Sequence, residues 1–285
     1  MRFLCLHGKG TSAKIFKSQT GTRLIHSPVV IFKMLMEILK ANFRALLPDS
    51  YEFDFINGPY PDIAAAGIDL FYKPPYYSHY ATPALADIKR GHQWLLQYIK
   101  DNGPYDGVMN FSQGCALVSS FLLYHQQQNP NAEPLFKVAI FICGGLPLVV
   151  ASDLGVDVTE EARNWDKSSK QQLMSRASSD AILREGSKRW GLGFDPYAEV
   201  DKKNVFGINF DDVPKEMLIK IPTVHVYGAK DPRFPASVTL AHFCDPGSRK
   251  TYDHGGGHDI PRRREVSEMM AELVEWSGMM ADRWW

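Results

Sequence analysis

The sequence predicts an α/β fold, built on a doubly wound and mostly parallel β-sheet. Short apolar runs alternate along the chain with longer segments whose apolar residues recur at helical spacing. Two of the runs, residues 136–145 and 221–231, are almost continuously apolar, which is typical of parallel strands covered by helices on both faces. The 285 residues suit one large domain.

The remaining strands follow from local pattern. Residues 2–6, "RFLCL", form a short apolar run, and residues 51–56, "YEFDFI", alternate and are rich in aromatic side chains. Residues 105–111, "YDGVMNF", form an apolar run that leads to a serine. Residues 248–258 are expected to form a last short strand and its loop.

Helices are predicted between these strands. Residues 29–47 carry apolar side chains at helical spacing and end before Pro48. Residues 83–100 and 112–128 give two further helices, the second of which begins at the serine that follows a strand. Residues 265–280 form a closing amphipathic helix.

Two regions depart from the alternation. Residues 57–80 are dense in Pro, Gly and Tyr and are predicted to form a long loop, and long loops in compact domains are often functional. Residues 146–215 are polar and charged, with helices expected at 159–176 and 179–190. We interpret 146–215 as a helical cap inserted over a single domain that spans residues 1–285. The alternative is a surface excursion without a functional role.

Composition excludes several classes of function. The 32 basic and 32 acidic residues cancel, so the sequence lacks the basic excess typical of proteins that bind nucleic acid or an anionic membrane. No apolar run is long enough for a transmembrane helix, and the N-terminal run is too short for a signal peptide. The four cysteines are scattered, which favours a reducing, cytoplasmic location and gives no zinc motif. We expect neither a metal nor an organic cofactor.

Ser112 is the first candidate catalytic residue. It is the centre of "NFSQG", residues 110–114, between a predicted strand and a predicted helix. This is the setting of a nucleophile elbow, G-x-S-x-G, in which a sharp turn exposes the serine at the end of a strand. Asn110 replaces the first glycine of that motif, and asparagine tolerates unusual backbone angles better than most residues. An ordinary turn serine is the alternative.

An activated serine needs a base and an acid that orients the base. In folds that use the elbow these follow in the order serine, acid, histidine, each after a strand. Asp231 ends the run "VHVYGAKD", and His258 closes the glycine-rich "HGGGH". The shared order and placement predict a Ser112–Asp231–His258 triad. His254 is the rival base.

A third element is an oxyanion hole. "HGKG", residues 7–10, follows the first strand and can aim a backbone N–H at the reacting carbonyl. We assign the two donors to Lys9 and to Gln113, the residue after the serine. His7 is expected to support this loop. "GKGTS" does not meet the phosphate-binding G-x-x-x-x-G-K-[ST] pattern.

Aromatic side chains of the 57–80 loop are predicted to line a substrate pocket. His79 is included, with exposure on the loop as the alternative. The predicted substrate-binding residues are Phe71, Tyr72, Tyr76, Tyr77, His79 and Tyr80.

These motifs together resemble the fungal serine hydrolase family of α/β-hydrolases, whose members include thioesterase-like enzymes of fungal polyketide clusters. The matching stretches are "FLCLHGKGTSAKIFKSQTGTRL", "GIDLFYKPPYYSHY", "YDGVMNFSQGCAL", "IPTVHVYGAKDP" and "GGGHDIPR", which lie between residue 2 and about residue 262. The resemblance implies an α/β-hydrolase fold and the triad named above. Asn110 stands where the family usually has glycine.

The leading hypothesis is therefore a cytoplasmic serine hydrolase that cleaves an ester or thioester of an apolar acyl group. The resemblance implies that the substrate is a polyketide, presented by a carrier protein of a polyketide synthase or supplied as a small-molecule ester. One alternative keeps the triad and changes the reaction to carbon–carbon bond cleavage or formation, of retro-Claisen or aldol type. Another is a catalytically inactive protein that binds a hydrophobic ligand.

Overall fold

The computed structural model of this chain describes residues 1–21, 43–195, 198 and 200–284. Most of the helix expected at residues 29–47 therefore lies outside the described residues. Its last part, Phe43–Leu46, forms a short 3-10 helix, η2.

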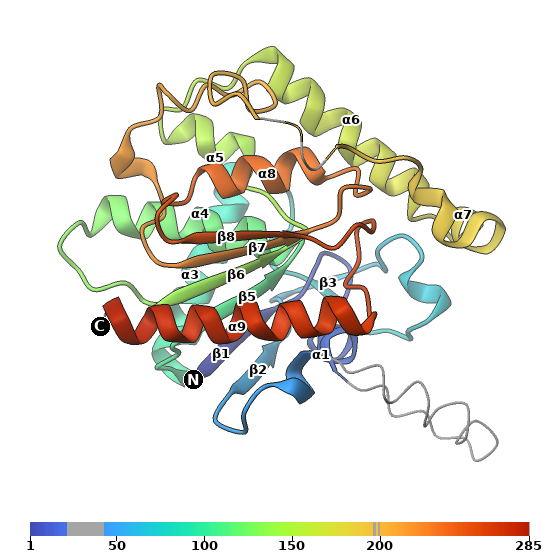
Figure 1. Cartoon of the computed structure of the whole chain (residues 1–285), viewed down its shortest axis with the longest axis horizontal. Coiled ribbons are helices and arrows are strands. Elements are labelled where there is room, and N and C mark those ends of the chain that lie inside the picture. The colour runs from blue at the N-terminus through green and yellow to red at the C-terminus, as the bar shows by residue number, and fades with distance from the viewer. Residues whose placement is uncertain (22–42, 196–197, 199, 285) are drawn as a thin grey trace.

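A six-stranded parallel sheet forms the centre of the molecule, which confirms the predicted fold class (Figure 1). Its order, β2-β1-β5-β6-β7-β8, places β1, β5, β6 and β7 in the interior of the sheet. β5 and β6 are buried at every position, as parallel strands covered on both faces should be. The strands are β1 Arg2–Leu6, β2 Glu52–Ile56, β5 Gly107–Phe111, β6 Val138–Ile142, β7 Thr223–Tyr227 and β8 Arg249–Asp253.

Alternate side chains of each strand enter different cores, because successive strand residues point to opposite faces. In β1, Leu4 and Leu6 join one core, whereas Phe3 and Cys5 join the other. The first core is closed by α3 and α4 and receives Leu240 from α8, and the second is closed by α1 and α9 (Figure 1). The helices are α1 Ala13–Thr20, α3 Leu85–Asn102, α4 Gln113–Gln128, α8 Phe234–His242 and α9 Arg264–Trp284.

The region predicted as a long loop, residues 57–80, contains regular structure. β3 (Tyr60–Asp62) and β4 (Tyr76–Ser78) pair antiparallel, with the short 3-10 helix η3 (Ile68–Leu70) between them. The Tyr77 amide donates to the Thr11 carbonyl at 2.7 Å. This ties the region to the segment that follows β1, where the predicted oxyanion loop lies.

The long connection from β6 to β7 is largely helical. It contains α5 (Leu148–Asp153), α6 (Glu160–Arg176), α7 (Ser179–Glu185), η4 (Gly186–Trp190) and η5 (Lys215–Met217). Thr159 caps α6 by accepting a hydrogen bond from the Ala162 amide, and Glu160 and Glu161 lie in its positively polarised first turn. In Figure 1, α6 and α7 extend beyond the edge at which the parallel strands end.

Within the ranges that the structure describes, no helix combines the length and the apolar character that a membrane crossing requires.

Candidate active site

Ser112 occupies a strained turn between β5 and α4. Its φ is 52° and its ψ is −107°, a region that residues with side chains rarely adopt. Its amide donates to the Ile142 carbonyl at 3.0 Å, so β6 holds the turn in place. A Cβ at Gly114 would lie 2.6 Å from the Leu6 carbonyl oxygen, so only glycine lets the first turn of α4 approach β1 this closely.

Asn110 does not prevent this turn. Its side chain is fully buried, and its amide nitrogen Nδ2 donates to the Ile140 carbonyl of β6 at 3.3 Å. Its Oδ1 atom has no hydrogen-bond partner among the described residues. The first position of the G-x-S-x-G motif therefore holds an asparagine whose amide nitrogen is hydrogen-bonded and whose amide oxygen, among the described residues, is not. Ser112 still adopts the strained backbone conformation of the turn.

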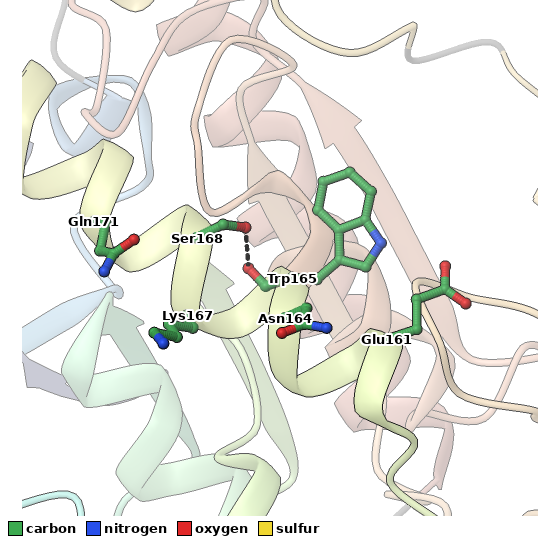
Figure 2. A pocket seen from close by; sticks show the side chains of 6 residues that line it. All are labelled: Glu161, Asn164, Trp165, Lys167, Ser168 and Gln171. Carbon is green, nitrogen blue, oxygen red and sulfur yellow. Dashed lines mark hydrogen bonds between the residues drawn. The ribbon is translucent and has the colours of Figure 1, made fainter.

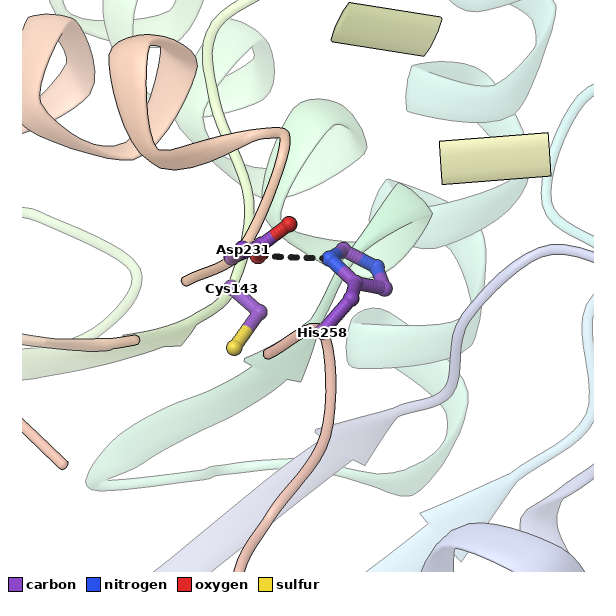
Figure 3. Close-up of side chains that lie close together, drawn as sticks. All are labelled: Cys143, Asp231 and His258. Carbon is purple, nitrogen blue, oxygen red and sulfur yellow. Dashed lines mark hydrogen bonds and ion pairs between the residues drawn. The ribbon is translucent and has the colours of Figure 1, made fainter. Parts of the chain in front are cut away.

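Ser112, His258 and Asp231 form one hydrogen-bonded chain. The Ser112 Oγ atom lies 3.0 Å from His258 Nε2. On the other side of the ring, His258 Nδ1 lies 2.7 Å from Asp231 Oδ2 (Figure 3). Asp231 is fully buried, and its other oxygen, Oδ1, accepts from the Arg233 amide at 2.7 Å. This arrangement fixes the imidazole with Nδ1 donating to the acid, which leaves Nε2 free to accept the serine proton.

His254, the rival base, lies elsewhere. Its Nδ1 accepts from the Gly256 amide at 3.1 Å, and its Nε2 is 3.7 Å from the sulfur of Cys143. Burial lowers the pKa of His254. The structure therefore brings His258, and not His254, to the serine.

Cys143 is the third side chain in Figure 3. Its Sγ atom and the ligand atoms of Asp231 and His258 all lie within 4.8 Å of one another, a grouping that could hold a metal ion. However, Asp231 and His258 already bond to each other, and burial raises the pKa of the Cys143 thiol well above its usual value. A protonated thiol is a poor metal ligand, so the local chemistry favours the hydrogen-bonded chain over a metal site.

Lys9 and Gln113, the predicted oxyanion-hole residues, line the same cavity as Ser112. The Gln113 side chain is fixed by its Oε1 atom, which accepts from the His79 amide at 2.9 Å. His7 holds the loop before Lys9 in place: its Nδ1 donates to the Gly8 carbonyl at 2.7 Å, and its Nε2 accepts from the Gly58 amide at 3.0 Å. Burial lowers the pKa of His7 to about 4, so the ring is neutral and can play both roles.

The cavity around Ser112 has a volume of about 370 Å³. Of the six loop residues predicted to bind substrate, Tyr80 lines it. His79 is fully buried behind it, where its Nε2 donates to the His7 carbonyl at 2.9 Å.

The other four predicted residues are not among those that line this cavity. Phe71 is 55% exposed beside the short helix η3. Tyr76 and Tyr77 belong to β4, and the Tyr76 hydroxyl donates to the Tyr72 carbonyl at 2.6 Å. The reason is the β3–β4 pairing, which turns this region back on itself instead of laying it over the serine.

Most of the remaining wall was not predicted from the sequence. It comes from the turn after β6 and from the inner face of α6, together with Arg233. The sequence did contain one signal for this wall, namely two adjacent glycines, Gly144 and Gly145, at a strand end. They mark a close backbone approach: a Cβ on Gly144 would lie 2.7 Å from the Ser112 carbonyl oxygen. These lining residues are Cys143, Gly144, Gly145, Leu146, Pro147, Asp166, Lys170, Leu173, Met174 and Arg233.

A second hollow lies on another face of α6 (Figure 2). It is formed by one helix alone and contains none of the residues of the Ser112 chain. Ser168 is its hydroxyl-bearing residue, and that hydroxyl donates to the Trp165 carbonyl at 3.3 Å. The lining residues are Glu161, Asn164, Trp165, Lys167, Ser168 and Gln171.

The chain is similar to known proteins in sequence and in structure. Residues 1–270 match the model of a family described as serine hydrolase (FSH1). The chain is 28% identical over 287 residues to hydrolase FUB4 of Fusarium oxysporum f. sp. lycopersici, covering 96% of this chain and 97% of the relative. It is 29% identical over 300 residues to esterase alnB of Emericella nidulans, covering 97% and 96%. Among solved structures, esterase PE8 aligns with a TM-score of 0.48 and 16% identity over 96% of this chain and 91% of that one.

The chain belongs to the serine hydrolase (FSH1) family, since the family model covers almost its whole length. It is therefore a serine hydrolase by family, built on a six-stranded parallel sheet with helices on both faces.

Proposed function

We propose that the protein cleaves an ester or thioester of an acyl group through an acyl-enzyme, with Ser112 as nucleophile. The observation that carries the proposal is the continuous chain from Ser112 Oγ to His258 Nε2 and from His258 Nδ1 to Asp231, at the wall of a cavity. This is the geometry that nucleophile activation needs.

The reaction follows from the positions of these groups. Ser112 Oγ attacks the acyl carbonyl while His258 Nε2 takes its proton. The backbone N–H groups of Lys9 and Gln113 stabilise the oxyanion, and each such donor contributes about 3–4 kcal/mol in known cases. The intermediate collapses as His258 returns the proton to the leaving alcohol or thiol, and His258 then activates a water that releases the acid.

The acyl group would occupy the 370 Å³ cavity. Tyr80, Leu146, Leu173 and Met174 supply apolar surface there, which supports an acyl chain rather than a fully polar one. We assign residues 146–215 the role of a cap, because four residues of α6 line the same cavity as Ser112.

The natural substrate we propose is a polyketide thioester presented by a carrier protein, or a related small-molecule ester, by analogy within the family. The proposed location is the cytoplasm. Its support is that the four cysteines are buried and unpaired, which suits a reducing compartment.

Hydrolysis of paired substrates tests this function. Hexanoyl-N-acetylcysteamine and 4-nitrophenyl hexanoate would be incubated with the native protein, Ser112→Ala and the matched control Ser168→Ala, which alters the hollow of Figure 2. We expect equimolar acid and thiol or phenol from the native protein and the control, and none above background from Ser112→Ala. Hydrolysis that survives in Ser112→Ala would refute the assignment. The hexanoyl chain carries no β-carbonyl, so an enzyme of retro-Claisen or aldol type would leave both substrates intact, as a binding protein would.

A further inference from the structure

The cavity beside Ser112 carries an excess of positive charge that the proposed hydrolysis does not use. Its lining includes three cationic side chains, Lys9, Lys170 and Arg233, and one carboxylate, Asp166. The whole chain is neutral, with 32 basic and 32 acidic residues. The excess is therefore local to the site.

The guanidinium of Arg233 has N–H groups that are not used in hydrogen bonds to the described residues. The Arg233 side chain is 15% exposed. Among the described residues, its Nη1 donates to Asp166 Oδ1 at 2.9 Å, to the Asp166 carbonyl at 3.1 Å and to Ser169 Oγ at 2.7 Å. Nε and Nη2 donate to nothing in the described part of the chain, and neither is a fully buried atom without a partner. Both nitrogens therefore keep some exposed surface and can donate to a bound group.

Lys170 and Lys9 add to this charge. The Lys170 ammonium lies 2.7 Å from Asp166 Oδ2, so one carboxylate is shared between two cations and one positive charge remains. Although partial burial alone would raise the pKa of Asp166, the two cations hold it below its usual value, which keeps Asp166 ionised. Lys9 has no ion-pair partner within the ranges that the structure describes, and it adds a second uncompensated charge.

We propose that Arg233 and Lys170, assisted by Lys9, form a subsite for an anionic group of the substrate, such as a carboxylate or phosphate, distinct from the scissile carbonyl. This inference rests on the proposed function and deepens it. A guanidinium with two free N–H groups suits a carboxylate or phosphate, and partial enclosure strengthens such charge-assisted bonds. The substrate would then combine an apolar acyl part with a negative charge on the acyl or on the leaving-group side.

Matched substrates separate the two sources of the charge. On the acyl side, the adipic acid monothioester of N-acetylcysteamine is compared with the corresponding adipamide thioester. On the leaving-group side, hexanoyl thioesters of 3-mercaptopropionate and 3-mercaptopropionamide are compared. Each pair differs in charge and hardly in shape. We expect the carboxylate to be favoured in kcat/KM by about tenfold or more in one pair, which is the size of hydrogen bonds to a charged partner.

Two substitutions distinguish recognition from simple support of α6. Arg233→Gln keeps the backbone amide that bonds Asp231 but removes the charge, so the carboxylate preference should fall several-fold, leaving only the contribution of Lys9. Asp166→Asn keeps an acceptor for Arg233 but releases both cations, so the preference should rise several-fold. A purely structural ion pair would make both substitutions move the preference in the same direction or leave it unchanged. Arg184→Gln, which changes an exposed pair on α7, is the matched control.

Binding to the Ser112→Ala protein, measured by calorimetry with the same four thioesters, makes the result independent of turnover. Tighter binding of one carboxylate substrate supports the subsite even if the native protein hydrolyses none of them, in which case the proposed function fails alone. Equal affinities and equal kcat/KM values within both pairs overturn the subsite while the hydrolase function stands. Shifts of the same sign in Arg233→Gln and Asp166→Asn also overturn it.

Discussion

The two walls of the cavity are built in different ways. The wall on the sheet carries Ser112 and His258, with Asp231 fully buried behind them. Ser112 and Asp231 are held by hydrogen bonds that involve the backbone, and His258 is held by its bond to Asp231. The wall on α6 carries Asp166 and Lys170, which are partly exposed and are tied to the rest of the site through Arg233. The first wall is fixed by packing, whereas the second depends on a few polar contacts. The difference suggests that chemistry resides on the rigid wall and that selectivity can change on the other.

The largest loss of activity should come from a substitution in the rigid wall, the one that carries Ser112, His258 and Asp231. That substitution is Asp231→Asn. The Arg233 amide would keep the asparagine oxygen at the Oδ1 position, so its NH2 group would face His258 Nδ1. That nitrogen would have to accept, leaving Nε2 protonated and unable to take the Ser112 proton. We expect kcat to fall about 10⁴-fold, as in other triads, in a steady-state thioester assay.

The matched control for that substitution is Asp253→Asn. Asp253 also lies at a strand end, and its Oδ1 accepts from the Ala229 and Gly255 amides, which an asparagine oxygen can also do. Activity close to that of the native protein is expected. A loss of less than tenfold in Asp231→Asn would contradict the role given to the acid.

A second test concerns the packing of the rigid wall. In Gly144→Ala, the new Cβ would lie 2.4 Å from the Cys115 Cβ and 2.7 Å from the Ser112 carbonyl oxygen. We expect the free energy of unfolding to fall by about 1–3 kcal/mol, measured by urea denaturation, because an overpacked site must shift backbone. In the control Gly247→Ala, the nearest non-neighbouring atom is 3.5 Å away, and little change is expected. Equal stability of the two variants would show that the wall is not tightly packed.

The pH dependence of stability gives a third test. Burial lowers the pKa of His7 to about 4 and that of His225 to about 3, whereas an unfolded histidine titrates near 6.5. As the pH falls from about 6.5 to 4, the unfolded chain therefore binds protons that the folded chain refuses, and stability is lost. Each histidine contributes at most about 1.4 kcal/mol per pH unit.

His225→Gln isolates one of these histidines. The free energy of unfolding, measured by denaturant titration between pH 6.5 and 5, should fall less steeply in this variant, by about 1 kcal/mol per pH unit on average. An unchanged slope would mean that His225 is protonated in the folded protein.

The smallest effect is expected at the outer end of the α6–α7 region. Arg184 and Asp180 form an i,i+4 pair at 2.8 Å, with side chains 75% and 79% exposed. Such pairs contribute less than about 0.5 kcal/mol, so Arg184→Ala should leave the unfolding midpoint almost unchanged in thermal denaturation. A loss larger than 1 kcal/mol, which is above the usual range for exposed pairs, would show that this region is held more firmly than the comparison states.

The sequence predicted the rigid wall because local rules govern it. A serine, an acid and a histidine that each follow a strand must meet at one edge of a parallel sheet, and the structure brings Ser112, Asp231 and His258 together there. The strained turn at Ser112 forms even with Asn110, since the strand pairing and Gly114 determine it.

The opposite wall could not be predicted in the same way. α6 is a polar helix whose sequence does not show which of its faces turns toward the serine, and Asp166 and Lys170 look like ordinary surface residues until α6 is packed. The tyrosines of residues 57–80 were expected in the cavity, but the β3–β4 pairing is a nonlocal contact that leaves Tyr80 at the wall and directs Tyr76 and Tyr77 elsewhere.

The most direct test of the central claim is labelling with a serine-directed fluorophosphonate, followed by intact-mass and peptide analysis of the native protein, Ser112→Ala and His258→Ala. The account predicts one adduct on Ser112 in the native protein, none in Ser112→Ala, and a greatly slowed reaction in His258→Ala. No adduct on folded native protein, or an unchanged rate in His258→Ala, would contradict the claim that His258 activates Ser112.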